Sequence, residues 1–267
     1  MCGKNKVLEL LLITNDPNEA RLWEAAGVDI IFIDLEVVGK HKRQGHLNTV
    51  VSNHHIEDVS SVKSALLSSK LLVRVNPLHQ SSQSEIDEVI YRGADIIMLP
   101  MFYSSDDIFE LIEIVAGRCQ IYPLIETPEA LSSIESLANI DAVSGFHFGL
   151  NDLHLSLGLK FMFEVMGLPE FRNATDVLKK SNKLFGIGGV ARLGEGILPA
   201  EIVIRENYRL GSQRMILSRS FKSNVEKNNY SEEIQAINKT YSCSNLIDLK
   251  ENQMNFSRIV KEIAESA

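Results

Sequence analysis

Short runs of branched apolar residues recur along the chain, and helical patterns separate most of them. Two passages look alike, Ala25 to Asp34 (AAGVDIIFID) and Tyr91 to Pro100 (YRGADIIMLP), and Leu137 to Gly149 is a weaker third copy. In the first two, a helical pattern ends at Gly, Asp follows, and an apolar run leads to a polar or proline stop. This order is typical of a helix C-cap followed by a strand that is buried on both faces. The repeat therefore predicts parallel strands connected by helices.

The same criteria, applied along the whole chain, predict eight strands. They lie near 7–14, 28–35, 71–75, 95–100, 120–126, 142–149, 184–189 and 214–218. Helix start signals stand between several of them, at Asp16-Pro17, Ser104, Thr127-Pro128 and Pro199-Ala200. Eight strands that alternate with helices predict a single α/β domain over residues 1–267, a closed (β/α)₈ or TIM barrel. An open doubly wound sheet is the alternative, but no strand is followed by a complete G-x-G-x-x-G motif.

The segment 231–267 is predicted to be a C-terminal helical extension of the barrel. Apolar residues stand at helical spacing at Leu246, Leu249, Met254, Ile259 and Ile263. An amphipathic helix needs a surface to cover. The pattern therefore predicts a helix that packs on its own barrel or on a neighbouring subunit.

Composition narrows the class of protein. The chain has 267 residues, 45% of them hydrophobic and 23% charged, which suits one large core and excludes a disordered chain. The formal net charge of -8 argues against a nucleic-acid surface. The N-terminus lacks the pattern of a secretory signal, and the chain has no apolar run long enough to span a membrane. These observations predict a cytoplasmic protein that binds neither nucleic acid nor membrane.

Polar residues follow several of the predicted strands, where the active site of such a barrel lies. Glu126 and Asp152 would project from adjacent strands into one mouth. Two carboxylates repel each other there unless a hard cation such as Mg²⁺ or Mn²⁺ neutralises them. A carboxylate after a strand is more commonly a helix cap, but Thr127 is the better cap beside Glu126. The pattern therefore indicates a metal site as one interpretation and a helix cap as the other.

Five motifs in this order resemble one known family. They are IDLE, VRVN, GADIIMLPM, PLIETPEAL and GLNDLHLSLG. The set is similar to the HpcH/HpaI aldolase and citrate lyase β-subunit family, metal-dependent pyruvate or acyl-CoA lyases that are built on (β/α)₈ barrels. The resemblance is close over Val28 to Leu159 and looser over the remainder.

The resemblance implies a role for each matching residue. Glu126 and Asp152 match metal ligands, for Mg²⁺ or Mn²⁺ and with Co²⁺ as a further candidate, and Arg74 matches the arginine that contacts the keto or enolate oxygen. Asp34 and Glu36 match the acidic pair that positions water or the metal shell. Pro100, Met101 and Phe102 fall where the family's substrate carboxylate loop lies. The family's assembly implies a homotrimer or homohexamer.

The acid–base group departs from the family pattern. Val37 stands where the aldolase branch has a histidine and where the citrate lyase branch has another acid. The basic run Lys40 to Arg43 follows at once, either as a solvated loop or as a set of groups that face an anionic substrate. Lys40, His41 and His46 are therefore candidates for the general base, and a water on the metal held by Glu36 is another.

A glycine-rich stretch from Phe185 to Glu201, FGIGGVARLGEGILPAE, follows the seventh predicted strand. Its backbone N–H groups at Gly188 and Gly189 suit an anion, with Arg192 and Arg219 adding charge. A plain glycine-rich turn with a surface arginine is the alternative.

Two histidines flank Asp152 in the sequence. His147 lies in an apolar strand and is interpreted as a core histidine whose hydrogen bonds are satisfied, and His154 is a candidate for the surroundings of the metal site.

The leading hypothesis is a divalent-metal-dependent carbon–carbon lyase that makes or cleaves 4-hydroxy-2-oxo acids through a pyruvate enolate. Its partners would be a small keto acid and an aldehyde or thioester that the sequence does not identify. A citrate-lyase-like acyl-CoA lyase and a non-catalytic barrel that binds a keto acid or an acidic sugar are the alternatives.

Overall fold

The strands form one parallel sheet in a computed structural model that describes residues 8–39, 53–218, 229–242 and 246–266. They are β1 (Glu9–Ile13), β2 (Ile30–Asp34), β3 (Lys70–Arg74), β4 (Ile96–Met98), β5 (Gln120–Ile121), β6 (Leu124–Ile125), β7 (Gly145–Phe148), β8 (Leu184–Ile187) and β9 (Arg214–Leu217). The order in the sheet is β5-β4-β3-β2-β1-β9-β8-β7-β6, and every recorded strand pair is parallel. All eight predicted strands are present, and the predicted TIM-barrel fold is confirmed.

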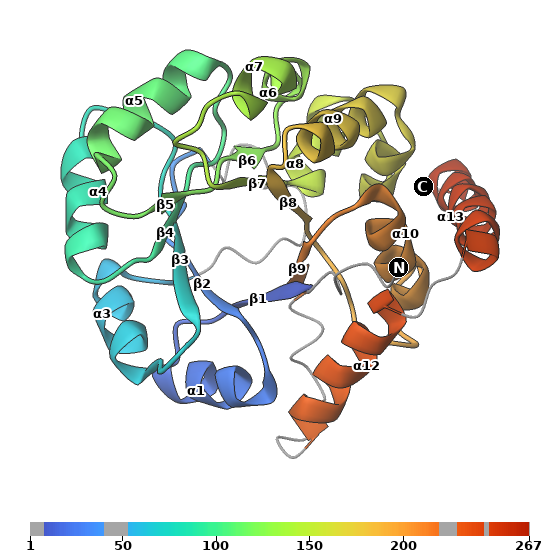
Figure 1. The fold of residues 1–267 in the computed structure, drawn as a ribbon, viewed down its shortest axis with the longest axis horizontal. Coiled ribbons are helices and arrows are strands. Elements are labelled where there is room, and N and C mark those ends of the chain that lie inside the picture. The colour runs from blue at the N-terminus through green and yellow to red at the C-terminus, as the bar shows by residue number, and fades with distance from the viewer. Residues whose placement is uncertain (1–7, 40–52, 219–228, 243–245, 267) are drawn as a thin grey trace.

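The predicted strand over 120–126 is divided into β5 and β6, and it closes the barrel. Pro123 lies at the division and has no backbone N–H to donate to a neighbouring strand. On one side, the backbone N–H of Tyr122 donates to the carbonyl of Ile97 at 2.9 Å. On the other side, His147 N donates to the carbonyl of Pro123 at 3.0 Å. The short segment therefore joins both edges of the sheet, and Figure 1 shows the strands as a ring seen along the barrel axis.

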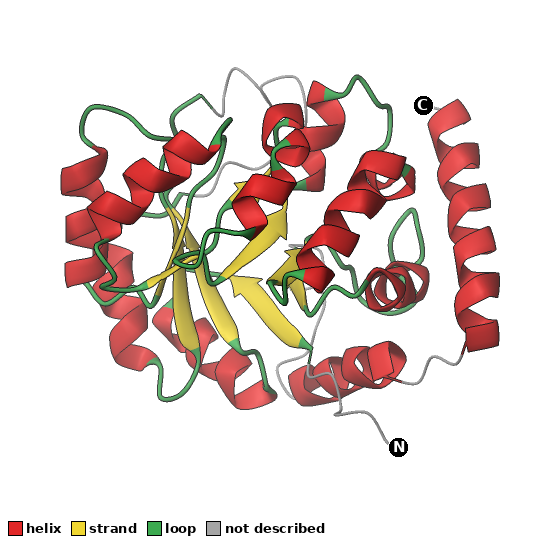
Figure 2. Cartoon of the chain, turned by 45° about the horizontal axis from the view of Figure 1, so that its top comes forward, coloured by secondary structure: helices red, strands yellow, loops and turns green. Residues whose placement is uncertain are grey.

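Helices surround this ring (Figures 1 and 2). They are α1 (Pro17–Ala26), α3 (Ile56–Ala65), α4 (Ser82–Tyr91), α5 (Ser105–Val115), α6 (Pro128–Ser132), α7 (Ile134–Ala138), α8 (Leu150–Ser156), the 3₁₀ helix η1 (Met162–Gly167), α9 (Pro169–Lys180), α10 (Ala200–Leu210), α12 (Tyr230–Ser242) and α13 (Leu246–Ser266).

The helix starts follow the sequence signals. Asp16 is the N-cap of α1, and its side chain accepts hydrogen bonds from two backbone N–H groups of the first turn. Thr127 is the N-cap of α6 and accepts from Ala130 N at 3.1 Å. Since Thr127 is the cap, the neighbouring Glu126 is available for another role.

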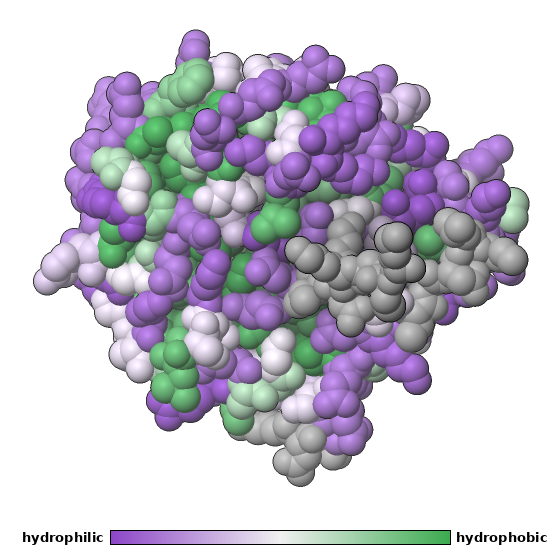
Figure 3. Space-filling model, viewed as in Figure 1, coloured by the Kyte–Doolittle hydropathy of each residue, from purple (hydrophilic) through white to green (hydrophobic). Residues whose placement is uncertain are grey.

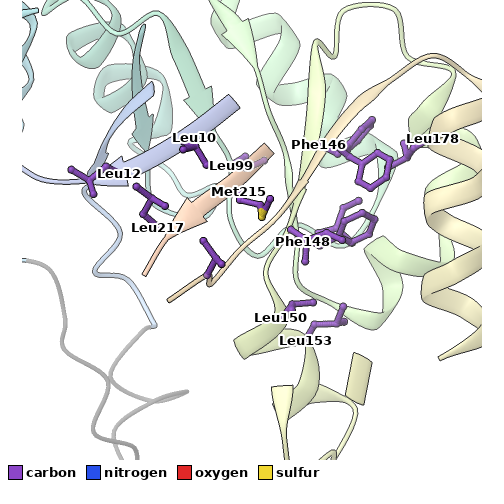
Figure 4. Packing of buried hydrophobic residues seen from close by; sticks show 14 of the residues in the cluster. Leu10, Leu12, Leu99, Phe146, Phe148, Leu150, Leu153, Leu178, Met215 and Leu217 are labelled. Atoms are coloured by element: carbon purple, nitrogen blue, oxygen red, sulfur yellow. The ribbon is translucent and has the colours of Figure 1, made fainter. Parts of the chain in front are cut away.

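Two apolar regions lie on opposite sides of the barrel wall. The larger one fills the space between the strands and the helices, where Phe146 and Phe148 of β7 lie near Leu178 of α9 (Figure 4). The smaller one includes Phe32, Leu124 and other side chains from alternate strand positions, which face the barrel interior. The strands are therefore buried on both faces, as their continuous apolar runs predict.

The C-terminal helices cover their own barrel. Helix α12 packs on α1 and α10, and Tyr230 of α12 stacks on Trp23 of α1 with ring centroids 3.9 Å apart. Helix α13 packs on α10 and η1, with Phe256 and Val260 buried four residues apart. Met254, one of the apolar positions predicted for this helix, is 67% exposed and lies outside this buried row, so its packing on a neighbouring subunit stays a prediction.

The outer surface is mixed in character. Hydrophilic residues cover most of the face in Figure 3, with smaller hydrophobic areas between them. Among the described helices, none is both long enough and apolar enough to cross a membrane.

Candidate active site

An ion-paired arginine stands at the C-terminal ends of β2 and β3. Arg74 Nε and Nη2 donate to the two carboxylate oxygens of Asp34 at 2.8 and 2.9 Å, and Nε lies 3.3 Å from Glu36 Oε2. Both carboxylates are buried. Burial acts to lower the pKa of Arg74, but Asp34 and Glu36 outweigh it and raise that pKa, so the guanidinium stays charged. The two strand ends therefore hold one fixed positive group in a defined orientation.

The second group of charges consists of Glu126 after β6 and Asp152 in the first turn of α8. Both are buried. Burial raises the pKa of Glu126 to about 8; Arg74 opposes this shift, whereas Asp152 and Glu36 add to it. Glu126 is therefore close enough to Asp152 and Arg74 for their charges to act on its carboxylate.

The charges suit a divalent cation. Glu126 and Asp152 supply hard oxygen ligands, and the raised pKa of Glu126 reflects burial and repulsion that a cation would relieve. Within the described part of the chain, no cluster of three or more His, Cys, Asp or Glu residues has the arrangement of a metal site. The two carboxylates therefore fit a cation that takes its remaining ligands from water and substrate oxygens, as Mg²⁺ commonly does.

The state of Glu126 gives the protein a defined pH dependence. Its pKa is about 8 in the fold against an ordinary value of 4.5, so the folded state holds this proton more tightly than the unfolded chain does. Without metal, the contribution of Glu126 to stability therefore falls as the pH rises from about 4.5 to about 8. A cation competes with the proton, so Mn²⁺ affinity should rise about tenfold per pH unit between pH 6 and 7.

Mn²⁺ titrations followed by electron paramagnetic resonance at pH 6, 7 and 8 measure this rise, and thermal unfolding in chelator measures the loss of stability. In the Glu126→Gln variant, the unfolding temperature in chelator should depend less steeply on pH than it does in the wild-type protein. A Mn²⁺ affinity that does not change with pH would contradict the assignment.

The loop after β4 reaches directly to this group. Met101 has a left-handed backbone conformation with φ of 47°, and its N–H donates to Glu126 Oε1 at 2.9 Å. The next residue, Phe102, is fixed by its carbonyl, which accepts from the hydroxyl of Thr127 at 2.7 Å. The predicted carboxylate loop, Pro100 to Phe102, therefore lies at the site and is held to the segment that carries Glu126.

A mostly apolar pocket lies beside this loop. Its lining is Val38, Gly39, Pro77, Leu78, Leu99, Met101, Phe102, Tyr103 and Asp107. Since Met101 belongs both to the pocket and to the contact with Glu126, the pocket adjoins the charged site.

The predicted anion site after β8 is only partly described. Gly189 has a φ of 88°, which favours glycine at that position. Arg192 pairs with Glu233 of α12 at 2.6 Å and lies 3.6 Å from Glu195, so its guanidinium is engaged with neighbouring carboxylates. Arg219 lies outside the described residues. Binding of a substrate anion by Gly188, Gly189, Arg192 and Arg219 stays a prediction.

Three candidates for acid–base chemistry also lie outside the described residues, namely Lys40, His41 and His46. The side chain of Val37 is 51% exposed, and its backbone N–H donates to Asn76 Oδ1 at 2.9 Å. The position of the family histidine therefore supplies no titratable side chain in this protein.

His54, which no sequence pattern indicated, lies at the end of β2. The backbone N–H of Asp34 donates to His54 Nδ1 at 3.0 Å. The neighbouring segment is held by Asp58, whose Oδ2 accepts from Asn15 Nδ2 and from His55 N, both at 2.8 Å. In the sequence, His54 stands 20 residues after Asp34, beyond the KHKR run, and no motif marks it.

Two other histidines flank the acidic group. His154 Nδ1 lies 3.2 Å from the carbonyl of Leu150 within its own helix. His147 is buried, but its Nε2 has no hydrogen-bond partner among the described residues, so the interpretation as a satisfied core histidine is wrong.

Solved structures with a similar fold include three that match most of this chain. The HpcH/HpaI aldolase from Desulfitobacterium hafniense DCB-2 has a TM-score of 0.59 and 16% identity, covering 80% of this chain and 86% of its own. RipC from Yersinia pestis has a TM-score of 0.61 and 17% identity, covering 90% and 98%. The protein CitE from Mycobacterium tuberculosis, in complex with magnesium and pyruvate, has a TM-score of 0.63 and 15% identity, covering 96% and 99%. At these identities the likeness establishes the fold.

Family membership rests on the sequence. No curated protein sequence matches the chain. A model of one family, described as HpcH/HpaI aldolase/citrate lyase, matches residues 10–191 and so covers more than half of the protein. The members of this family are in general lyases that act on carbon–carbon bonds. The chain belongs to the HpcH/HpaI aldolase/citrate lyase family.

Proposed function

We propose that this protein is a divalent-metal-dependent carbon–carbon lyase that makes or cleaves 4-hydroxy-2-oxo acids through a pyruvate enolate. The observation that carries the proposal is the burial of Glu126 and Asp152 in one site with the fixed charge of Arg74. Two acids and an arginine in this arrangement suit a substrate that binds a cation and develops negative charge on an oxygen.

Glu126 and Asp152 are proposed to hold the cation, Mg²⁺ or Mn²⁺ with Co²⁺ as a further candidate. When bound, such a cation polarises the keto oxygen of a 2-oxo acid. Arg74 would stabilise the negative charge that develops on that oxygen when a carbon–carbon bond breaks or forms. Asp34 keeps the guanidinium in place by accepting two hydrogen bonds from it, and Glu36 forms an ion pair with it.

The remaining roles are proposed from position. The backbone of Pro100 to Phe102 would receive the substrate carboxylate, and the apolar pocket beside Met101 would receive the unreacting part of the second substrate. Lys40, His41, His46 and a water near Glu36 remain candidates for proton transfer. His54 joins them because its ring is fixed beside Asp34. The homotrimer or homohexamer and the cytoplasmic location also remain predictions.

A citrate-lyase-like acyl-CoA lyase is the second candidate. The observation that favours it is the similarity to CitE over nearly the whole of both chains. A barrel that binds a keto acid or an acidic sugar without catalysis is the third, and the missing histidine is the observation behind it.

Deuterium exchange into the methyl group of pyruvate, followed by proton NMR in D₂O, tests the proposal directly. Exchange should appear with Mg²⁺, Mn²⁺ or Co²⁺ and should stop when a chelator is added, because enolate formation needs the cation. Cleavage of malyl or citramalyl thioesters without pyruvate exchange would favour the second candidate. Binding of metal and pyruvate without either reaction would favour the third.

A further inference from the structure

One side of the barrel interior is built largely from glycine. At Gly145, Gly149, Gly186 and Gly188, on β7, on β8 and just beyond them, a Cβ atom would meet a side chain that occupies the interior. A Cβ on Gly145 would lie 2.6 Å from Arg214 Nη1, and one on Gly186 would collide with His147 Nδ1. The two strands therefore leave room for large polar side chains, namely Arg214 from β9 and His147 from β7.

Both residues pair in register with Gly186, but their side chains have different surroundings. Arg214 Nε pairs with Glu9 Oε2 at 2.5 Å, and Nη2 donates to the hydroxyl of Tyr122. Its guanidinium also lies over the Tyr122 ring, 4.1 Å from the centroid. Arg214 is thus partnered by Glu9, the first residue of β1, and by Tyr122, which follows β5.

His147 lies one layer beneath the charged site. It pairs in register with Leu124, and Glu126 stands two residues beyond Leu124 on the same face of that segment. Gly149, two residues beyond His147, is packed against Glu126, because a Cβ there would lie 2.7 Å from Glu126 Oε2. His147 therefore forms part of the floor under the carboxylates and Arg74.

Nε2 of this ring is a buried atom that lacks a partner among the residues that the structure describes. His147 is 2% exposed, and its Nε2 makes no hydrogen bond within the described part of the chain. Nε2 would lie 3.3 Å from a Cβ on Gly188, at the C-terminal end of β8, where a side chain would cover it. Burial, together with the charges of Arg214 and Arg74, lowers the pKa of His147 to about 3, so the imidazole is neutral.

An unpaired polar atom destabilises a protein interior, and an apolar side chain would fill this place without that cost. The neutral ring keeps one N–H group and one lone pair. The oxygens of an anionic carboxylate or an enolate accept hydrogen bonds and do not donate them. The tautomer that carries its proton on Nε2 could therefore donate a hydrogen bond to such a ligand near Gly188. In this tautomer the lone pair is on Nδ1, beside Gly186.

We propose that His147 is a substrate-binding residue whose Nε2–H donates a hydrogen bond, from the floor of the site, to an oxygen of a bound 2-oxo carboxylate. The inference rests on the proposed function, since it names the same substrate. Gly188 is part of this arrangement because it places no side chain against the buried Nε2. The bond would orient the keto acid from below, whereas Arg74 acts from the rim.

The experiment compares pyruvate affinity in the presence of Mg²⁺ with unfolding temperature in four variants. His147→Phe keeps a planar ring and removes the unpaired nitrogen, so its unfolding temperature should stay equal to the wild-type value or rise, while pyruvate affinity falls at least tenfold. His147→Gln keeps an N–H group near the position of Nε2 and should recover part of that loss. Gly188→Ala keeps His147 but covers Nε2, and should also weaken pyruvate binding.

Tyr122→Phe is the matched control. It removes a polar partner of Arg214 at the opposite end of the interior, so it should lower the unfolding temperature and leave pyruvate affinity unchanged. Wild-type affinity in His147→Phe or, if that variant does not fold, in both His147→Gln and Gly188→Ala would overturn the inference alone. A wild-type protein that binds neither pyruvate nor longer 2-oxo acids with Mg²⁺ would overturn the inference together with the proposed function.

Discussion

Glu126→Gln should abolish the metal-dependent exchange of pyruvate protons and leave the barrel folded. Replacing a residue that only supports a metal ligand commonly costs about 10–100-fold in metal affinity or activity, so replacing a ligand itself should cost more than about 100-fold. The fold should tolerate the change because Glu126, with a pKa of about 8, is already mostly protonated at pH 7 without metal. The amide oxygen of glutamine can still accept from Met101 N, which lies 2.9 Å from Oε1.

Circular dichroism and unfolding temperature in chelator separate the two effects. The matched control is Glu129→Gln, an exposed acid three residues along the chain in the first turn of α6, which should change neither exchange nor metal affinity. Glu126→Gln protein that exchanges pyruvate protons at the wild-type rate would remove Glu126 from the metal site.

Arg74→Ala should lose both enolate chemistry and much of the stability. Removing one donor that stabilises a developing oxyanion typically costs about 100–1000-fold in rate. The variant also leaves Asp34 and Glu36 buried without their cation, and breaking a buried pair typically costs about 3–5 kcal/mol. Urea unfolding and pyruvate exchange with Mn²⁺ are the two measurements.

A double variant separates the two consequences of losing Arg74. Asp34→Asn added to Arg74→Ala removes one of the uncompensated charges, so it should recover part of the stability and none of the exchange. Arg92→Ala, which breaks a surface pair with Glu88 at 2.7 Å, is the control and should change stability by less than about 1 kcal/mol. Full exchange in Arg74→Ala would show that the arginine has a structural role alone.

The strands and helix starts were predictable because their signals are local. Asp16 and Thr127 cap their helices as the sequence indicates, since a cap depends on residues within one turn. The division of the strand over 120–126 follows from Pro123, which the sequence contains but which the apolar pattern outweighed. The buried row of α13, which includes Phe256 and Val260, could not be chosen from the apolar spacing alone, because the choice of face depends on the helices beneath it.

The site was predictable only as far as it lies at strand ends. Asp34 and Arg74 end neighbouring strands, so their contact follows from the barrel order. His54 could not be placed, because it stands 20 residues after Asp34 and no local pattern links the two positions. The surroundings of His147 Nε2 depend on glycines of another strand. No pattern within its own strand therefore shows that this nitrogen lacks a partner among the described residues.

The stack of Trp23 on Tyr230 has a consequence for the order in which the chain is made. Trp23 emerges from the ribosome early. Tyr230, whose ring covers it, is synthesised only after most of the barrel. Contacts between residues so far apart in the sequence form slowly, because a long loop must close first. The first helix therefore keeps one apolar ring accessible to chaperones throughout most of translation, until α12 reaches it.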